Sequence, residues 1–265
     1  MSASKTTLHL QRCVLLSLLA IFISGNACQV KRKPDTGISK PSATSTSTST
    51  YTYTYTTKSP HPDGTGKVYW GREIAHVMSA SGAGWLERDT RQEEENVALA
   101  ITKLNLNSSS VVADIGAGTG YYTFRIAPQV PQGKVYAVEV QDEFIAALEA
   151  RKKELSLTNV EVTKGTSQSP NLPDASVDLA IMVDVYHELE YPHEMLQAIH
   201  KALKPNGKLL LLEYRAEDQA IPIKELHKMS VAQVNKELGS NNFKLYQKED
   251  FLPIQHFLLY EKVKE

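Results

Sequence analysis

Short apolar runs alternate with amphipathic segments from about residue 110 to the end of the chain. The apolar runs are rich in β-branched and small side chains, as in parallel strands that are buried on both faces. They predict strands near 111–115, 134–139, 159–163, 177–183 and 207–214. Apolar residues at helical spacing predict helices near 121–128, 142–155 and 192–203, and two late runs, 243–246 and 257–262, predict a closing antiparallel pair. The alternation indicates an α/β fold with a doubly wound, mostly parallel sheet.

The first predicted strand, Val111–Ile115, is followed by three alternating glycines, Gly116, Gly118 and Gly120. Glycine adopts positive φ readily and lets backbone N–H groups approach a ligand closely, and a helix that follows offers its positive N-terminal end. A tight strand-to-helix turn without a ligand is the alternative. A bare turn rarely needs three spaced glycines together with an acid in the strand, so we interpret this segment as a nucleotide-cofactor loop.

The second predicted strand ends in an acid, Glu139. It lies about 20 residues beyond Gly120, where a carboxylate can accept hydrogen bonds from the hydroxyls of a ribose. Dinucleotide-binding proteins share this arrangement, but their loop has the spacing G-x-G-x-x-G, and Tyr121 stands here at the last glycine position. The spacing therefore disfavours a dinucleotide.

These residues resemble the class I S-adenosylmethionine-dependent methyltransferases of the small type 11 kind, over roughly residues 94–213. The stretch 114–120 matches the acid-x-G-x-G-x-G loop of that family, Glu139 matches its ribose-binding acid, and 203–209 matches its late Pro-Gly turn and fifth strand. The resemblance implies the Rossmann-like methyltransferase fold and S-adenosylmethionine as cofactor.

The cofactor site that follows from this resemblance comprises Asp114, Gly116, Ala117, Gly118, Gly120, Glu139, Val140, Thr166, Ser167 and Asp184. In one place the chain departs from the family. The relatives carry Gly-Asp-Ala after the third strand, where the Asp contacts the adenine amino group, whereas this chain has Gly-Thr-Ser-Gln at 165–168. A hydroxyl or amide oxygen can still accept that hydrogen bond.

The segment after the fourth predicted strand, 183–189, is the candidate place for chemistry, because the carboxyl end of such a strand overhangs the ligand crevice. His187 is the candidate base or substrate-orienting group, since its unperturbed pKa near 6.5 suits proton transfer. A structural histidine that caps the next helix is the alternative. Tyr186 is a second, weaker catalytic candidate.

A metal site in this segment would use His187, Glu188, Glu190, His193 and Glu194. The sequence lacks the second histidine of H-E-x-x-H, so we expect no metal here. Elsewhere, Trp70 and Trp85 are candidates to stack on the substrate or to shield the sulfonium, with ordinary aromatic packing as the alternative. Arg215, His227 and Lys228 would suit an anionic substrate or be solvated charges.

The first part of the chain has a different character. Residues 1–27 resemble a secretory signal peptide, with cleavage expected before Cys28 as in a bacterial lipoprotein, although Gly25 stands where the usual signal has Leu. We expect export to the bacterial cell envelope, with membrane attachment through a lipidated Cys28. An uncleaved anchor with the domain facing the cytoplasm is the alternative, because the basic cluster 31–33 follows the apolar run.

The expected organisation is then a disordered Ser/Thr/Tyr/Pro-rich tether at 28–66, N-terminal lid helices at 67–109 and a methyltransferase domain at 110–264. Both cysteines, Cys13 and Cys28, lie in the targeting segment, so the domain has no thiol nucleophile and no cysteine metal site.

The 265-residue chain has a formal net charge of −1, which argues against a nucleic-acid partner. We therefore expect methyl transfer from S-adenosylmethionine to a small-molecule acceptor by in-line displacement. An exported S-adenosylmethionine-binding or catalytically degenerate protein is one alternative. A nucleotide-dependent oxidoreductase is another. The sequence indicates neither the acceptor nor the oligomeric state.

Overall fold

The computed structural model describes residues 55–263 of the chain. The predicted signal peptide, Cys28 and the predicted tether up to residue 54 lie outside these residues. In the part that is described, no helix has both the length and the apolar character that crossing a bilayer requires.

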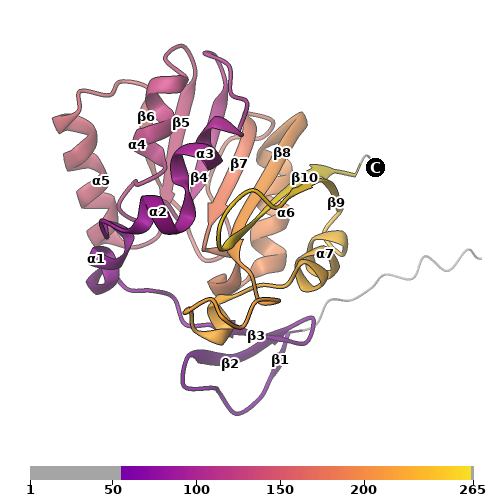
Figure 1. The fold of residues 1–265 in the computed structure, drawn as a ribbon. Helices are drawn as coiled ribbons and strands as arrows, with labels where there is room; N and C mark the ends of the chain where they lie inside the picture. The colour runs from indigo at the N-terminus through magenta and orange to yellow at the C-terminus, as the bar shows by residue number, and fades with distance from the viewer. Residues whose placement is uncertain (1–54, 264–265) are drawn as a thin grey trace, which may run out of the picture. The chain divides into compact units, whose positions relative to one another are not determined.

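Residues 55–263 contain a main sheet of seven strands in the order β6-β5-β4-β7-β8-β10-β9 (Figure 1). The strands are β4 (Val111–Ile115), β5 (Lys134–Glu139), β6 (Val160–Lys164), β7 (Val177–Val183), β8 (Leu203–Tyr214), β9 (Phe243–Glu249) and β10 (Gln255–Lys262). Strands β4 to β8 pair in parallel, and β10 pairs antiparallel with both β8 and β9. The predicted doubly wound sheet with a closing antiparallel pair is confirmed.

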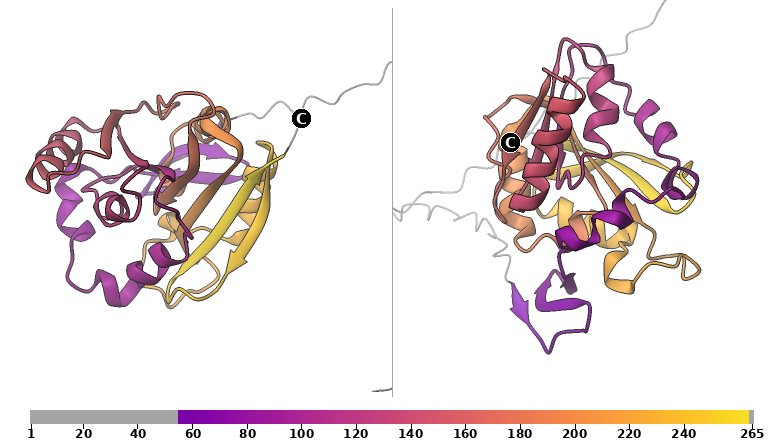
Figure 2. Two further views of the ribbon diagram at one scale, coloured as in Figure 1. Left: turned by 90° about the horizontal axis from the view of Figure 1, so that it is seen from above. Right: turned by 90° about the vertical axis from the view of Figure 1, so that its left-hand side faces the viewer.

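Helices cover both faces of this sheet (Figure 2). The side chains of α4 (Thr123–Ile126) and α5 (Asp142–Glu154) belong to one apolar cluster, and those of α6 (Pro192–Ala202) and α7 (Val231–Gly239) belong to the other. Residues of β8 alternate between the two clusters, since Leu209 and Leu211 belong to the second and Leu210 and Leu212 to the first. Successive side chains of a strand point to opposite faces of the sheet, and here both faces are buried. Both sets of side chains are therefore apolar, which explains the continuous apolar runs in the sequence.

Local signals explain where several helices begin. The first turn of α5 carries Asp142 and Glu143, which suit the positive N-terminal end of a helix. Helix α6 starts with Pro192, whose missing N–H costs nothing in the first turn. The side chain of Ser230 caps α7 by accepting a hydrogen bond from the backbone N–H of Gln233.

Two of the differences between the predicted and the observed boundaries have a local explanation. The helix expected at 121–128 is a four-residue α4 followed by a 3₁₀ turn at Ala127–Gln129, because Pro128 cannot donate the hydrogen bond that would continue the helix. Strand β8 starts at Leu203 rather than at 207, since Leu203 already pairs with Val177 before an irregularity in the register.

The N-terminal part of the described chain was predicted incompletely. A separate small sheet contains β1 (Thr56–Thr57), β2 (Gly64–Tyr69) and β3 (Arg72–Ala75), so the predicted end of the tether at residue 66 is wrong. The expected lid helices start only after this sheet, as α1 (Ala83–Leu86), α2 (Arg91–Glu95) and α3 (Val97–Thr102).

Candidate active site

A cavity of about 840 Å³ opens at the carboxyl ends of β4, β5 and β7. Its wall also includes parts of the N-terminal segment that precedes α2 and of the segment that follows β8. Ligands bind at this edge in doubly wound sheets. The volume falls within the range of small-molecule sites, about 300–1,000 Å³.

The sequence-predicted residues divide into two groups. Those that line the cavity are Gly116, Gly118, Glu139, Val140, Thr166, Ser167, Asp184 and His187. Those that are not part of its wall are Asp114, Ala117, Gly120 and Tyr186. Most of the predicted cofactor site is therefore brought together, and the remaining residues lie behind it.

The glycine loop is held against the end of β5. The backbone N–H of Gly116 donates to the carbonyl of Val138 at 2.9 Å, and that of Gly118 donates to Oε2 of Glu139 at 2.9 Å. Both glycines have positive φ, 73° and 55°, and a Cβ at Gly118 would lie 2.9 Å from a methyl carbon of Leu86. A side chain here is disfavoured by the backbone and by the space available.

The carboxylate of Glu139 accepts three backbone hydrogen bonds at this edge of the sheet. Besides Gly118, its carboxylate accepts hydrogen bonds from the backbone N–H groups of Val140 at 2.7 Å and of Gln141 at 3.1 Å. The side chain is nearly buried, yet it lines the cavity. It thus connects the loop after β4 to the start of α5.

Three residues that were predicted to bind the cofactor are buried behind the cavity wall and contact other parts of the protein. Oδ2 of Asp114 accepts the hydroxyl of Thr123 at 2.6 Å, and burial raises the pKa of Asp114 to about 6. A Cβ at Gly120 would lie 2.3 Å from the ring of Phe124, so this glycine permits packing between the loop and α4 rather than ligand approach. Ala117 is likewise buried away from the cavity wall.

Asp184 follows β7 and has a φ of 53°. Its Oδ2 accepts a hydrogen bond from the side-chain amide of Gln255 at 2.8 Å, whereas its buried Oδ1 has no hydrogen-bond partner among the described residues. Burial, together with the nearby carboxylates of Glu95 and Glu213, raises the pKa of Asp184 well above its usual value. An unpaired buried oxygen in a cavity wall is costly and marks a place for a ligand donor.

His187 lines the cavity, although only two per cent of the residue's surface is exposed. Its Nδ1 is 2.7 Å from Oε2 of Glu213, and its Nε2 is 3.1 Å from Nδ1 of His227. Because a carboxylate oxygen only accepts, Nδ1 of His187 carries a proton. Burial alone would lower the pKa of His187, but the adjacent Glu213 carboxylate outweighs it and the pKa is raised. Burial and the charge of His187 lower the pKa of His227 to about 4.

Glu188 lines the cavity next to His187. Its Oε2 accepts the backbone N–H of Met78 at 3.0 Å, and burial raises its pKa to about 7. The contact with Met78 joins the segment after β7 to the N-terminal segment.

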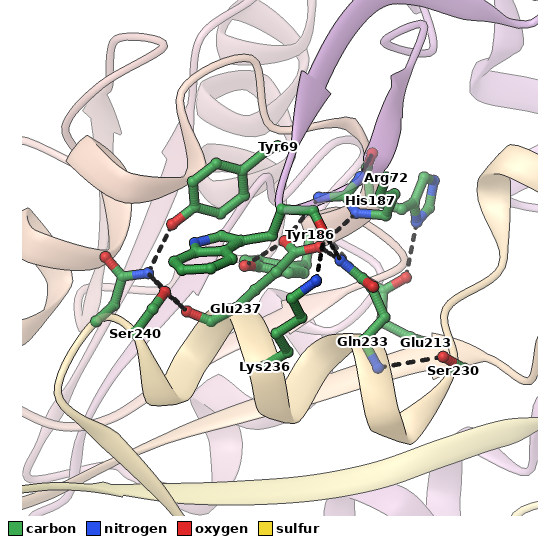
Figure 3. Close-up of polar contacts among 12 residues, drawn as sticks. Tyr69, Arg72, Tyr186, His187, Glu213, Ser230, Gln233, Lys236, Glu237 and Ser240 are labelled. Carbon is green, nitrogen blue, oxygen red and sulfur yellow. Dashed lines mark hydrogen bonds and ion pairs between the residues drawn. The ribbon is translucent and has the colours of Figure 1, made fainter. Parts of the chain in front are cut away.

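Tyr186 is completely buried, and its hydroxyl donates to Oε2 of Glu237 at 2.8 Å. This position corrects the prediction of a catalytic role, because the side chain points into the core and not to the cavity. Figure 3 shows it within a polar cluster that also contains Arg72 and Gln233. The guanidinium of Arg72 donates to Glu237 at 2.8 Å and to the backbone carbonyl of His187 at 2.8 Å, so the cluster fixes the backbone that carries His187.

The two tryptophans have different positions. Trp85 lines the cavity, remains half exposed and stacks on the guanidinium of Arg88 at 3.9 Å. Trp70 is not part of the cavity wall and lies in the turn between β2 and β3, where its carbonyl accepts a hydrogen bond from Lys236. The packing alternative therefore applies to Trp70.

Sequence reasoning missed the partners of His187. Glu213 was assigned only to the end of a strand, and His227 only to a possible anion site. Pairing of Val183 with Leu212 brings Glu213 beside the segment after β7, so the strand order contained the signal for this contact. No local signal indicates His227 or Arg72, since both reach the site through tertiary contacts.

The central part of the chain is similar to known methyltransferases. Residues 113–209 match the family described as a methyltransferase domain. An uncharacterized methyltransferase-like protein of Schizosaccharomyces pombe is 34% identical over 117 residues, which is 44% of this chain and 43% of that protein. A tRNA U34 carboxymethyltransferase of Desulfotalea psychrophila is 33% identical over 112 residues, which is 42% of this chain and 33% of that protein. The matched segment thus spans less than half of these relatives.

Among solved structures, a SAM dependent methyltransferase from Aquifex aeolicus has the same fold. Its TM-score is 0.65 at 24% sequence identity, and the match covers 69% of this chain and 98% of that one. Residues 113–209 therefore match a methyltransferase domain, the structure has the fold of this solved methyltransferase, and the cofactor that such a domain implies is S-adenosylmethionine.

Proposed function

We propose that the protein transfers a methyl group from S-adenosylmethionine to a small-molecule acceptor by in-line displacement. The observation that carries this proposal is that the glycine loop, Glu139 and His187 line one cavity. The groups proposed to bind the cofactor and the residue proposed to act on the methyl acceptor, His187, therefore line the same cavity. Orientation within such a space supplies on the order of 7–11 kcal/mol toward a two-reactant step.

The residues at the β4 and β5 edge fit the cofactor. Gly118 lines the cavity without a side chain of its own, and the carboxylate of Glu139 faces the cavity as an acceptor for ribose hydroxyls. The unpaired Oδ1 of Asp184 suits an ammonium group, and the half-exposed Val140 offers an apolar surface to a purine. When bound, S-adenosylmethionine supplies a methyl group on a sulfonium sulfur.

His187 acts on the acceptor. With Nδ1 directed to Glu213, its Nε2 is the ring nitrogen that can orient a group in the cavity, or accept a proton from it, once that group replaces the contact with Nδ1 of His227. Glu213 fixes the ring, as the carboxylate does in other histidine–carboxylate pairs. A positioned base contributes about 10²–10⁴-fold to such a step.

The acceptor proposal favours a small molecule over a nucleic acid. The chain has a net charge of −1, and the cavity volume of about 840 Å³ falls in the range of small-molecule sites. The relative from Desulfotalea psychrophila is named for tRNA, so transfer RNA is the alternative to be tested directly.

The test uses methyl-labelled S-adenosylmethionine with the full-length chain, pools of phenols, amines and carboxylic acids, and total tRNA. We expect label in a small molecule, equal amounts of demethylated cofactor, and no label in tRNA. His187→Ala should bind the cofactor with unchanged affinity and lose turnover. Label in tRNA alone would contradict the acceptor class, and full turnover by His187→Ala would assign that residue to structure.

We also propose export and lipid attachment at Cys28, on the sequence of the targeting segment alone. Mass spectrometry of the mature N-terminus measures this directly. A lipid-modified Cys28 as first residue is expected, and an intact Met1 would support the anchored alternative.

A further inference from the structure

Three potential metal ligands converge at the acceptor side of the cavity. His187 and Glu188 come from the 3₁₀ turn after β7, and His227 comes from a second 3₁₀ turn in the segment after β8. One ligand atom of each lies within 4.8 Å of those of the other two. All three residues line the cavity, so a ligand entering it can reach them.

The distance between the two imidazoles suits a shared cation. Nε2 of His187 and Nδ1 of His227 are 3.1 Å apart. Two nitrogens that each lie about 2.0–2.1 Å from a first-row divalent ion are separated by this distance at an angle of about 100°. In the absence of a metal, a proton between the two nitrogens satisfies both. A cation that replaces this proton requires the rings to turn until both nitrogen lone pairs point at the ion.

The surroundings also match those of a metal site. Glu213 holds Nδ1 of His187 at 2.7 Å, which leaves Nε2 as the ligating nitrogen, and carboxylates of this kind stand behind most metal-bound histidines. Glu213 is fully buried and also accepts the backbone N–H of Tyr186, so its position is fixed. On Glu188, Oε2 is engaged by Met78, which leaves Oε1 available to the cavity.

We propose that His187, Glu188 and His227 bind a divalent transition-metal cation, with Zn²⁺ as the reference ion, and that this cation binds the acceptor oxygen. Two histidines and one carboxylate with an open position form a ligand set that catalytic metal sites use. The inference rests on the proposed function for the identity of the acceptor. It narrows the acceptors to molecules with an ionisable oxygen, such as a phenol or an enol, whose proton passes to solvent on binding. With Nε2 bound to the ion, His187 acts on the acceptor through the ion and no longer as the base.

This proposal departs from the expectation that the segment after the fourth strand holds no metal. That expectation rested on the missing second histidine of H-E-x-x-H within the segment. The fold supplies the second histidine from position 227, which is 40 residues from His187 in the sequence.

The experiment is calorimetric titration of Zn²⁺, and separately of Mg²⁺, into full-length, tag-free protein stripped with a chelator. We expect one Zn²⁺ per chain and much weaker binding of Mg²⁺, which prefers oxygen ligands. His227→Gln should weaken Zn²⁺ binding at least 100-fold, and Glu213→Gln should weaken it about 10- to 100-fold. His76→Ala is the matched control, because His76 lies in the same cavity wall outside the cluster and its loss should leave Zn²⁺ affinity unchanged.

Titration of S-adenosylmethionine into the same wild-type sample separates this inference from the proposed function. Cofactor binding without saturable Zn²⁺ binding, or equal Zn²⁺ affinity in wild type and His227→Gln, would overturn the metal site and leave the proposed function standing. Zn²⁺ binding without cofactor binding would support the site and contradict the proposed function. If His227→Gln does not fold by circular dichroism, Glu188→Gln gives the same comparison.

Discussion

Replacing Glu139 by Gln changes the most heavily hydrogen-bonded side chain of the proposed cofactor site. A carboxylate offers about four acceptor positions, and three are used by the backbone N–H groups of Gly118, Val140 and Gln141. One position therefore remains for a ribose hydroxyl. The amide of Gln must place its NH₂ group against backbone donors. The fewest hydrogen bonds are lost when the NH₂ group points toward Gly118, and there it would also replace the acceptor that we propose for the ribose.

The expected loss of cofactor affinity corresponds to one hydrogen bond, the one from the ribose hydroxyl. One hydrogen bond to a charged acceptor contributes about 1.5–3 kcal/mol, so the Kd for S-adenosylmethionine should rise about 10- to 150-fold. Isothermal titration calorimetry of the full-length chain measures it without knowledge of the acceptor. The melting temperature should also fall by a few degrees, because Gly118 loses its acceptor.

Glu143→Gln is the matched control. Glu143 lies on α5 close to Glu139 in the sequence and is exposed, so the same change of charge should leave Kd unaltered. A Glu139→Gln variant that binds S-adenosylmethionine with wild-type affinity would refute the assignment of Glu139 to the ribose.

Three further perturbations test other parts of the structure. Gly118→Val places a β-branched residue at a φ of 55° and should abolish calorimetric binding of S-adenosylmethionine while the far-ultraviolet spectrum stays native; unchanged affinity would exclude the loop from the cofactor site. Arg72→Met leaves the buried charge of Glu237 unpaired and should lower the free energy of unfolding in urea by about 3–5 kcal/mol, whereas a change within 1 kcal/mol, by the same principle, would show that the pair is dispensable. Burial raises the pKa of Asp114 from 3.8 to about 6, so the folded state binds this proton more tightly than the unfolded state, and stability should fall as the pH rises through that interval. Asp114→Asn should flatten that part of the pH profile of urea unfolding, and superimposable profiles would contradict the raised pKa.

Much of the main sheet was predictable because its signals are local. Val111–Ile115 and the run before Tyr214 are buried from both faces, so their apolar character is visible in sequence without knowledge of their neighbours. The glycine loop and Glu139 were found for the same reason, since each follows directly from the end of a strand. The structure places them together because parallel strands end at one edge.

The small N-terminal sheet escaped prediction for a specific reason. Its hairpin turns at Trp70 and Gly71, which both have positive φ, as in a two-residue turn of type I′. The usual signal of that turn is Asn-Gly or Asp-Gly, and Trp in its first position conceals it. Contacts of Arg72 with α7 stabilise the hairpin, and no pattern within the hairpin itself shows them.

The acceptor side depends on contacts between distant segments. Tyr186 and His187 are neighbours in sequence and were both catalytic candidates. The hydroxyl of Tyr186 is buried against Glu237, whereas the ring of His187 lines the cavity. The short 3₁₀ turn that carries them has no strand or helix period from which a direction could be read. Their different orientations, and the arrival of His227, are decided by tertiary packing.

Calorimetric titration of the full-length wild-type protein with S-adenosylmethionine, its demethylated product and NAD tests the central claim most directly. We expect one saturable site for S-adenosylmethionine, competition by the demethylated product at the same site, and no binding of NAD. Binding of NAD with no binding of S-adenosylmethionine would contradict it and would restore the nucleotide-dependent oxidoreductase that the loop spacing disfavours.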